Sequence, residues 1–381
     1  SLGSTEVTLS SLSSGDYSQI LELTDKFNDI YGERKVSFSL PSIKVESFNP
    51  ELLEKISSVR KSGLTFAIEA GSIEGQRTVN KPIALDKVKN IIDYASKNGW
   101  NLIKLYFMIG LPHVENEKEA IIDFIENVLK INKKLNINVN VAVFVPKPHT
   151  PYQNERQLNL EESVEILDEI RERFKKTRAR IKSHNPYTSY VEGFISRGDE
   201  RVGLAVYEVF KNGGRLDGWS EKFNFELYKN AFEKYDIVYD KYLSKKSLDE
   251  KNVWDMVDVG LTGEYLSKEN IKSQNKELTP SCKEGCEKEC SICGGDVKKV
   301  NSDKNSNIDL EKYKNSSEKR EKKITRYFLE FSKSGLLKFI GHIDTLKYFE
   351  RLFFVSEISS AFTEGFNPHP KLQFCSPLPL G

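Results

Sequence analysis

The chain has 381 residues, 57 basic against 56 acidic side chains and a net charge of +1, and 38% of its residues are hydrophobic. Its length predicts two domains, and its balanced charge excludes a globally polycationic protein that wraps nucleic acid, while a local basic face stays open. No apolar run approaches the ~18 residues of a membrane helix, and the first ten residues lack the charged start and apolar middle of a signal peptide.

Residues 5–180 alternate two kinds of segment. Short apolar and β-branched runs begin near Glu6, Lys35, Gly63, Asn101 and Asn138, and amphipathic stretches with a helical period lie between them. Strands that alternate with helices at this spacing predict βα units and a parallel sheet. Five consecutive units favour a barrel or partial barrel over a small open sheet.

Two of the amphipathic stretches have well-defined apolar faces. A cap-like Asn159, followed by Glu162 three residues later, predicts where the second helix begins. The first face comprises Ile121, Phe124, Ile125, Val128 and Leu129, and the second comprises Val164, Leu167, Ile170 and Phe174.

We predict four parts in the chain. Residues 1–180 form the partial barrel, and residues 181–260 form a polar helical extension. Residues 261–323 contain a cysteine-rich segment and a linker that holds too few large apolar residues to order itself. Residues 324–381 begin a second α+β domain, with a strand from Ile324 and a helix around Asp344–Phe354. Because the chain starts with Ser1 and stops directly after an apolar segment, we interpret it as an internal fragment of a longer protein.

The predicted strands are followed by glycine, proline and small polar residues, which let a ligand approach the backbone closely. In parallel βα folds, ligands gather at these carboxyl ends. Glu69 directly follows an apolar strand, where a carboxylate is costly unless it is paired or bound. The segments read SSGDY (13–17), SLPSIKVESF (39–48), EAGS (69–72), MIGLP (108–112) and FVPKPHTPY (144–152).

These segments, together with YVEGFISRGDERVG and RLDGWSEKFNF further on, resemble the radical S-adenosylmethionine (SAM) proteins, in particular the subfamily with a cobalamin-binding domain. The segments FLEFSKSGLLKFIGHIDTLKYFERLF and TEGFNPHPKLQFCSPLPLG resemble the start of an uncharacterised domain that is commonly linked to that family. The resemblance implies a partial (β/α)6 barrel of which strands 2–6 are present.

The resemblance also implies cofactors and partners. A [4Fe-4S] cluster, whose three cysteines would precede this fragment, would cleave SAM to methionine and a 5′-deoxyadenosyl radical that abstracts hydrogen from a substrate. An electron donor such as flavodoxin or ferredoxin would reduce the cluster, and the full-length protein could carry cobalamin.

Residue roles follow from family position alone. Ser14, Gly15 and Asp16 would meet the SAM amino group, and Glu69 and Ser72 would lie near the ribose. Ile109, Gly110 and Pro112 would flank the adenine, and Val145 would begin the segment that closes the last strand end. The resemblance assigns no residue of this chain to the hydrogen-transfer step.

Four cysteines crowd into residues 282–293, which indicates metal chemistry in a reducing compartment such as the cytoplasm. Three of them share the spacing of the SAM cluster loop, but they follow the barrel, and a fourth thiolate would close the iron site that SAM needs. A structural zinc or an auxiliary iron–sulfur cluster fits better, with a metal-free segment and the SAM cluster itself as the remaining alternatives. We expect Cys375, in an apolar context, to be a buried core residue. The four cysteines are Cys282, Cys286, Cys290 and Cys293.

Two further features leave alternatives open. His113 and His149 follow strand ends and are by default solvent-facing loop residues, with an acid–base or ligand role as the rival. Residues 322–338 mix basic and aromatic side chains, which suits either RNA contacts or a strand with its aromatics in a core.

We therefore expect a fragment of a radical SAM enzyme, inactive alone, whose full-length form acts on an unknown substrate, for which RNA or a ribosomal component is a candidate by analogy. The alternative is a non-catalytic, metal-stabilised adaptor or RNA-binding protein with a degenerate barrel.

Overall fold

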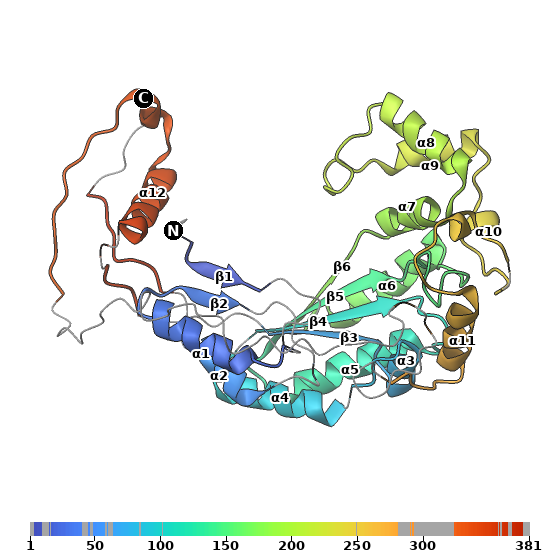
Figure 1. Cartoon of the computed structure of the whole chain (residues 1–381), viewed down its shortest axis with the longest axis horizontal. Helices are drawn as coiled ribbons and strands as arrows, with labels where there is room; N and C mark the ends of the chain where they lie inside the picture. The colour runs from blue at the N-terminus through green and yellow to red at the C-terminus, as the bar shows by residue number, and fades with distance from the viewer. Residues whose placement is uncertain are drawn as a thin grey trace. The chain divides into compact units, whose positions relative to one another are not determined.

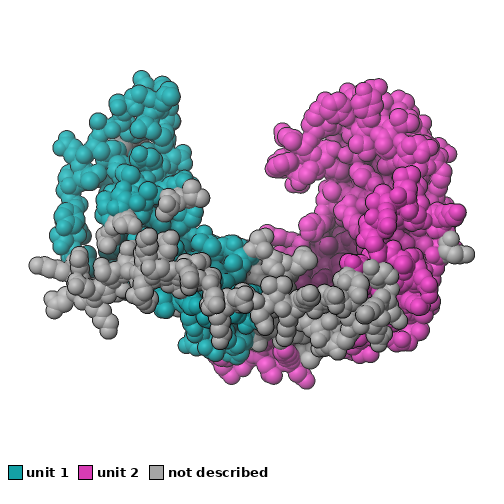
Figure 2. Space-filling model, viewed as in Figure 1, with its two compact units in different colours: residues 1–62, 302–381 teal, residues 63–301 magenta. Residues whose placement is uncertain are grey.

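The structure is a computed structural model, and it divides into two compact units: residues 1–62 with 302–381, and residues 63–301 (Figure 2). We describe each unit by itself. The structure describes residues 4–9, 15, 17–39, 45, 49–57, 59, 64–83, 85–100, 102–248, 250–280, 290, 292, 324–356, 358, 360–364 and 368–375.

The first unit begins with a short parallel βαβ arrangement. Strand β1 (Glu6–Thr8) pairs in parallel with β2 (Ser37–Ser39), and helix α1 (Ile20–Tyr31) connects them. Helix α2 (Pro50–Ser57) follows. These elements share a small core, as expected when the amphipathic faces of two helices cover one side of a strand pair. The core consists of Ile20, Phe38, Leu52 and Ile56.

The C-terminal part of this unit contains a 3-10 turn, Gly335–Phe339, and helix α12 (His342–Val355). The predicted helix around Asp344–Phe354 is therefore confirmed. The strand predicted from Ile324 is wrong: the described residues 324–334 form no strand, because no other described segment pairs with their backbone. The buried position predicted for Cys375 is also wrong, since the residue is exposed. Three rings pack together nearby: Phe331, Phe349 and Phe374.

The second unit is built on a four-stranded parallel sheet with strands in sequence order (Figure 1). Each neighbouring pair is parallel, so all four carboxyl ends lie at one edge. The strands are β3 (Leu64–Glu69), β4 (Leu102–Ile109), β5 (Asn136–Val143) and β6 (Ala179–Ser183).

The helices that connect these strands cover one face of the sheet. Helix α5 buries four of the five residues predicted for its apolar face and leaves Leu129 half-buried. At the start of α6, Asn159 and Glu162 form the predicted capping box, which satisfies two backbone groups at the helix start. The helices are α3 (Ile73–Thr78), α4 (Leu85–Lys97), α5 (Glu117–Ile131) and α6 (Leu160–Phe174).

After β6 the chain is helical. A separate apolar cluster that includes Phe194, Val209, Phe232 and Leu243 holds α7 to α10 together. Helix α11 then returns to α3. The elements are α7 (Pro186–Arg197), α8 (Glu200–Lys211), α9 (Phe225–Lys234), α10 (Tyr239–Tyr242), the 3-10 helix Val253–Met256 and α11 (Gly263–Gln274).

The predicted α/β class with parallel strands and helical crossovers is confirmed, and the arrangement is consistent with a partial radical SAM barrel. The described strands form two parallel sheets and no closed barrel. All five strands predicted in residues 5–180 are present, and the sequence pattern missed β6. None of the helices in the described ranges has the length and apolar character needed to cross a bilayer.

Candidate functional site

The two faces of the four-stranded sheet differ in character. Alternate residues such as Ile68, Phe107 and Val141 are buried against the helices. Their neighbours along each strand, such as Tyr106 and Asn140, are partly or fully exposed on the opposite face. We call this second set the inner face: Thr65, Ala67, Glu69, Lys104, Tyr106, Met108, Asn138, Asn140, Ala142, Arg180 and Lys182.

The strand register places the inner-face side chains in rows across the sheet. Tyr106 pairs with Ala67 on one side and with Asn140 on the other, and Asn140 pairs with Lys182. Among the described residues, neither the Tyr106 hydroxyl nor the Asn140 side-chain amide has a hydrogen-bond partner. Barrel interiors are usually filled by bulky apolar side chains, so polar groups here fit water or a polar ligand.

Apart from Glu69, the inner-face residues were not among the predicted site residues, because those residues all follow the strands or end them. A local signal for them was present: from Asn136 to Val141, asparagines alternate with isoleucine and valine. This pattern gives a strand one buried face and one polar face.

At the end of β3, Glu69 is paired within the protein. Its carboxylate lies 2.8 Å from the Lys81 ammonium, and its backbone is left-handed, with φ of 67°. The Ser72 hydroxyl accepts the Gly75 N–H at 3.1 Å and so caps α3. Lys81 therefore offsets the cost of placing the Glu69 carboxylate here, and any ligand contact at Ser72 competes with a helix cap.

At the end of β4, the backbone turns under a buried carboxylate. Glu117, in the first turn of α5, accepts the Gly110 N–H at 2.6 Å and the Leu111 N–H at 3.3 Å. Burial raises the pKa of Glu117 to about 7, although these two hydrogen bonds and Arg156 act in the opposite direction. Gly110 has φ of 79° and packs against Leu158, so a side chain would fit poorly there.

The other residues predicted at the ends of β4 and β5 differ in how accessible they are to a ligand. The Ile109 side chain is fully buried on the helix-covered face, and its carbonyl accepts the Phe144 N–H at 2.8 Å. Pro112 is buried, and Val145 is half-buried. Ile109 could therefore contact a ligand at the strand edge only through its backbone, and not through its side chain.

His113 is largely buried rather than solvent-facing, with 13% of its side chain exposed. Its Nε2 atom lies 3.5 Å from a Glu155 carboxylate oxygen and has no hydrogen bond among the described residues. Glu155 is itself buried and also contacts Lys245 at 3.1 Å and the Asn270 amide at 3.1 Å. Residues from after β4, after β5 and α11 thus meet at one buried carboxylate.

The loop after β5 is held by residues 244–280, which we call the strap. The Asn270 amide donates to the Pro151 carbonyl at 2.9 Å, and the Trp254 indole donates to the Gln153 amide oxygen at 2.9 Å. The Tyr152 hydroxyl contacts both Thr78 and Ser273, which links the strap to α3.

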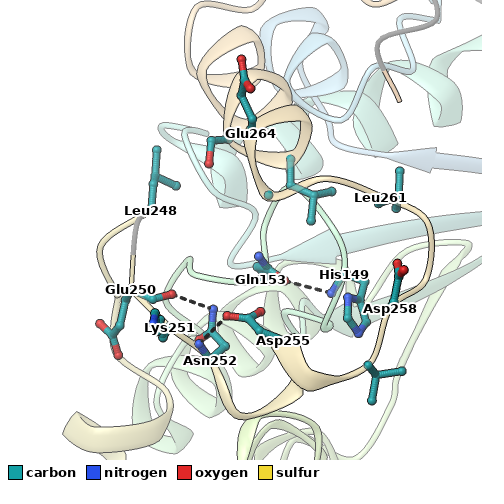
Figure 3. A pocket seen from close by; sticks show the side chains of 14 residues that line it. His149, Gln153, Leu248, Glu250, Lys251, Asn252, Asp255, Asp258, Leu261 and Glu264 are labelled. Atoms are coloured by element: carbon teal, nitrogen blue, oxygen red, sulfur yellow. Dashed lines mark hydrogen bonds between the residues drawn. The ribbon is translucent and has the colours of Figure 1, made fainter. Parts of the chain in front are cut away.

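The strap and this loop line an open pocket of about 660 Å³, a volume within the range of small-molecule sites. Figure 3 shows His149 and Gln153 between the strap residues around Asn252 and Asp255 and the side chain of Glu264 on α11. The Gln153 amide oxygen accepts the backbone N–H of His149 at 2.9 Å. This hydrogen bond holds the loop that carries His149 in place. His149 therefore lines an open pocket.

Several predicted site residues lie outside the described residues: Ser14, Asp16, Cys282, Cys286 and Cys293. Gly15 is half-buried, and Cys290 is described as a free thiol of intermediate exposure. Within the described ranges no three His, Cys, Asp or Glu side chains are grouped to hold a metal ion. The four-cysteine metal site stays a prediction.

Comparison with known families supports both resemblances, to the radical SAM proteins and to an uncharacterised C-terminal domain. Residues 1–125 match the radical SAM superfamily. Residues 326–381 match a second family, described as an uncharacterized protein conserved in bacteria (DUF2344). The radical SAM match covers β1 to β4 and most of α5, and so includes Glu69, the Gly110 turn and Glu117. Neither match bears on the cobalamin-binding subfamily, which stays a prediction.

Two curated relatives are uncharacterized proteins of Methanocaldococcus jannaschii. One is 30% identical over 251 residues, which is 65% of this chain and 50% of the relative. The other is 27% identical over 142 residues, covering 36% of this chain and 27% of the relative. The chain thus spans half the length or less of the curated relatives it matches.

Two solved structures show weak likeness. N-acetylneuraminate lyase from Mycoplasma synoviae has 8% identity and a TM-score of 0.25, and a sialic acid aldolase of Ruminococcus gnavus has 10% identity and a TM-score of 0.23. Each comparison covers 68% of this chain and 92% of the other. We draw nothing from either.

Proposed function

We propose that the protein is a radical SAM enzyme that cleaves S-adenosylmethionine to start a radical reaction on a substrate. The superfamily match over residues 1–125 carries this proposal. The polar inner face and the glycine- and proline-containing strand ends support it, because ligands of parallel βα folds gather at that edge.

The site geometry refines the roles proposed for individual residues. Glu69 with Lys81, the Gly110 turn and the half-buried Val145 lie at the carboxyl edge and are candidates to contact the ribose and adenine of SAM. Ser72 and Pro112 are candidates to shape this edge, since the Ser72 hydroxyl caps a helix and Pro112 is buried. To these we add Tyr106 and Asn140 on the inner face.

The described residues fit SAM better than they fit its cluster. Exposed amide, phenol and charged groups on the inner face suit a ligand with amine, carboxylate and ribose groups. A [4Fe-4S] cluster needs cysteine thiolates, and residues 1–281 contain no cysteine. We propose that this chain is part of a longer protein and that the cluster ligands lie in the remainder of that protein. When bound, the cluster would supply the electron that cleaves SAM to methionine and a 5′-deoxyadenosyl radical.

The cysteine-rich segment has a separate proposed role. Residues 282–293 would hold zinc or an auxiliary iron–sulfur cluster through Cys282, Cys286, Cys290 and Cys293. The strap that precedes this segment is anchored, because Thr279 and Asn80 exchange two hydrogen bonds of 3.0 and 3.1 Å. Metal analysis of the 381-residue chain after anaerobic reconstitution tests this role. One zinc, or one cluster insensitive to SAM, supports it, whereas a cluster that responds to SAM would make these cysteines the catalytic ligands.

Electron paramagnetic resonance of the longer protein tests the proposed function. The spectrum of the reduced cluster should change when SAM is added, and a spectrum unaffected by saturating SAM would contradict the proposal. Tyr106→Ala should weaken the SAM response about tenfold, which is the effect of losing a contact of about 1.4 kcal/mol. Tyr187→Ala is the matched control, because Tyr187 on α7 is equally exposed, at 39%, and lies off the inner face.

A further inference from the structure

Helix α8 carries an apolar face that the described residues leave uncovered. Val202, Ala205 and Val209 are buried in the helical core. On the rest of the helix surface Tyr207 is 55% exposed and Phe210 is 50% exposed. A surface helix normally places polar residues toward water, so these two rings need another explanation.

The rings are arranged as a stack with cations. Tyr207 and Phe210 are nearly parallel, with an angle of 11° between their planes and centroids 6.3 Å apart. The Lys211 ammonium lies 4.5 Å from the Tyr207 centroid, and the Arg215 guanidinium lies 3.5 Å from the Phe210 centroid. Arg215 also donates to the carbonyls of Phe210 and Gly214, at 2.5 and 2.6 Å, which fixes its position.

The loop after α8 adds two exposed apolar side chains. Leu216 is 62% exposed and has a left-handed backbone, with φ of 57°, and Trp219 is 59% exposed. The backbone N–H of Trp219 donates to the Leu216 carbonyl at 2.9 Å. The carboxylate of Asp217, which lies between these two residues in the sequence, accepts the Tyr228 hydroxyl at 2.7 Å. The loop is therefore folded, and it presents Trp219 on a fixed support. We call Tyr207, Phe210, Lys211, Arg215, Leu216 and Trp219 the aromatic surface.

Two of the carboxylates near the aromatic surface interact with residues outside it. Glu208 pairs with Lys234 at 2.8 Å, and Asp217 holds Tyr228. Glu200 lies at the opposite end of α8, and Glu221 is the remaining acid of the loop. Lys211 and Arg215 beside the rings, with the exposed Lys222 of the loop, therefore attract an anion, while the Asp217 and Glu221 carboxylates oppose it, so most of any affinity must come from the rings.

We propose that the aromatic surface binds single-stranded nucleic acid. Unpaired bases stack on aromatic side chains, and neighbouring cations contact the phosphates. A base would stack on the ring surface that the cation leaves open, the cation beside it would contact a phosphate, and the fixed loop lowers the entropic cost of binding. The surface is distinct from residues 322–338, for which the sequence suggested RNA contacts. The proposal does not depend on SAM chemistry.

Anisotropy titrations of the 381-residue chain with fluorescently labelled 12-nucleotide oligouridylate test the proposal. Oligothymidylate of the same length shows whether the 2′-hydroxyl contributes, and either oligonucleotide binding at this surface supports the proposal. Phe210→Ala or Tyr207→Ala should weaken binding about tenfold, since one base stacks on each ring. Tyr187→Ala is the control for loss of an exposed tyrosine elsewhere. Binding that these two variants leave unchanged, or that a duplex matches, would overturn the proposal.

Salt dependence gives a measurement that holds even if an alanine variant folds poorly. With two phosphates neutralised, log K should fall with log salt at a slope of about −1.4, and Lys211→Gln should reduce the slope by about 0.7. A slope near zero would contradict the proposal and point to a protein partner.

Tryptophan fluorescence reports where the oligonucleotide binds. Trp219 is 59% exposed, whereas Trp100 and Trp254 are 6% and 9% exposed, and the chain has three tryptophans. Stacking on the aromatic surface should therefore quench Trp219, and Trp219→Phe should abolish the quenching. Quenching that persists in Trp219→Phe would place the oligonucleotide elsewhere and refute the assignment.

Discussion

The Glu117 carboxylate accepts the Gly110 N–H at 2.6 Å, and so ties the first turn of α5 to the turn that ends β4. This contact joins a helix start to the strand edge where the candidate site lies. Because the carboxylate is buried, its protonation is coupled to the stability of that edge.

The first prediction concerns pH. Burial raises the pKa of Glu117 from 4.5 to about 7 in the folded protein. Between these values the folded state binds more protons than the unfolded state, so the free energy of unfolding should fall as pH rises, by on the order of 3 kcal/mol. Glu117→Gln keeps an acceptor for Gly110 and should remove this fall, so the variant should be the more stable protein above pH 7.

Urea unfolding at several pH values between 4.5 and 8 measures this effect. Glu119→Gln is the control, because Glu119 lies in the same helical turn and is exposed. If the Glu117→Gln protein kept the pH dependence of the natural chain, Glu117 would not be its source.

The second prediction compares two glycines. An added Cβ at Gly71 would overlap the backbone of Ala120 and Ile121, which cannot move without shifting α5. At Gly203, on the exposed side of α8, an added Cβ meets nothing. Gly71→Ala should therefore destabilise the protein by about 3 kcal/mol or more, and Gly203→Ala should stabilise it by about 0.5–1 kcal/mol. Thermal unfolding of both variants checks the pair, and similar melting temperatures would contradict the close approach at Gly71.

The third prediction concerns the buried Arg197. Its guanidinium donates to the Glu155 carbonyl at 2.7 Å and to the Ser244 carbonyl at 3.2 Å, which joins α7 to the loop after β5 and to the strap. Burial lowers its pKa to about 10. Arg197→Lys keeps the charge but replaces a two-pronged donor with a point charge, so it should destabilise by about 2 kcal/mol. Arg201→Lys, at a more exposed ion pair, should cost less, and the reverse order in denaturant unfolding would count against this role.

The fourth prediction concerns the strap. Asn270→Leu removes the donor that Pro151 and the buried Glu155 share, and an unsatisfied buried acceptor costs about 1–3 kcal/mol. Hydrogen exchange in residues 263–274 should therefore become faster. Asn275→Leu, just beyond α11, removes a contact to the exposed Glu277 and should leave exchange unchanged. Equal exchange in the two variants would show that Asn270 does not hold the strap.

The sequence predicted the elements whose signal is local. The β-branched run of β5, the apolar face of α5 and the Asn159–Glu162 capping box each depend on residues a few positions apart, and the structure confirms them. Strand β6 was not predicted, because Arg180 and Lys182 occupy its exposed positions and the strand contains too few apolar residues to be recognised.

Features that depend on distant partners could not be predicted in the same way. Nothing in the sequence shows that Lys81 pairs with Glu69 or that the strap returns to Tyr152. Burial of Cys375 was inferred from its apolar neighbours, but the fold around residue 375 leaves it exposed. The strand expected from Ile324 needed a neighbouring strand, and its own residues cannot supply one.

Cleavage of SAM by the proposed longer protein, of which this chain would be a part, tests the central claim most directly. The protein would be purified anaerobically, reconstituted with iron and sulfide, reduced with dithionite and incubated with SAM. We predict that 5′-deoxyadenosine and methionine form in equal amounts, as chromatography would show. A protein that holds a reduced [4Fe-4S] cluster and binds SAM, yet forms no 5′-deoxyadenosine with or without candidate substrates, would contradict the proposed function.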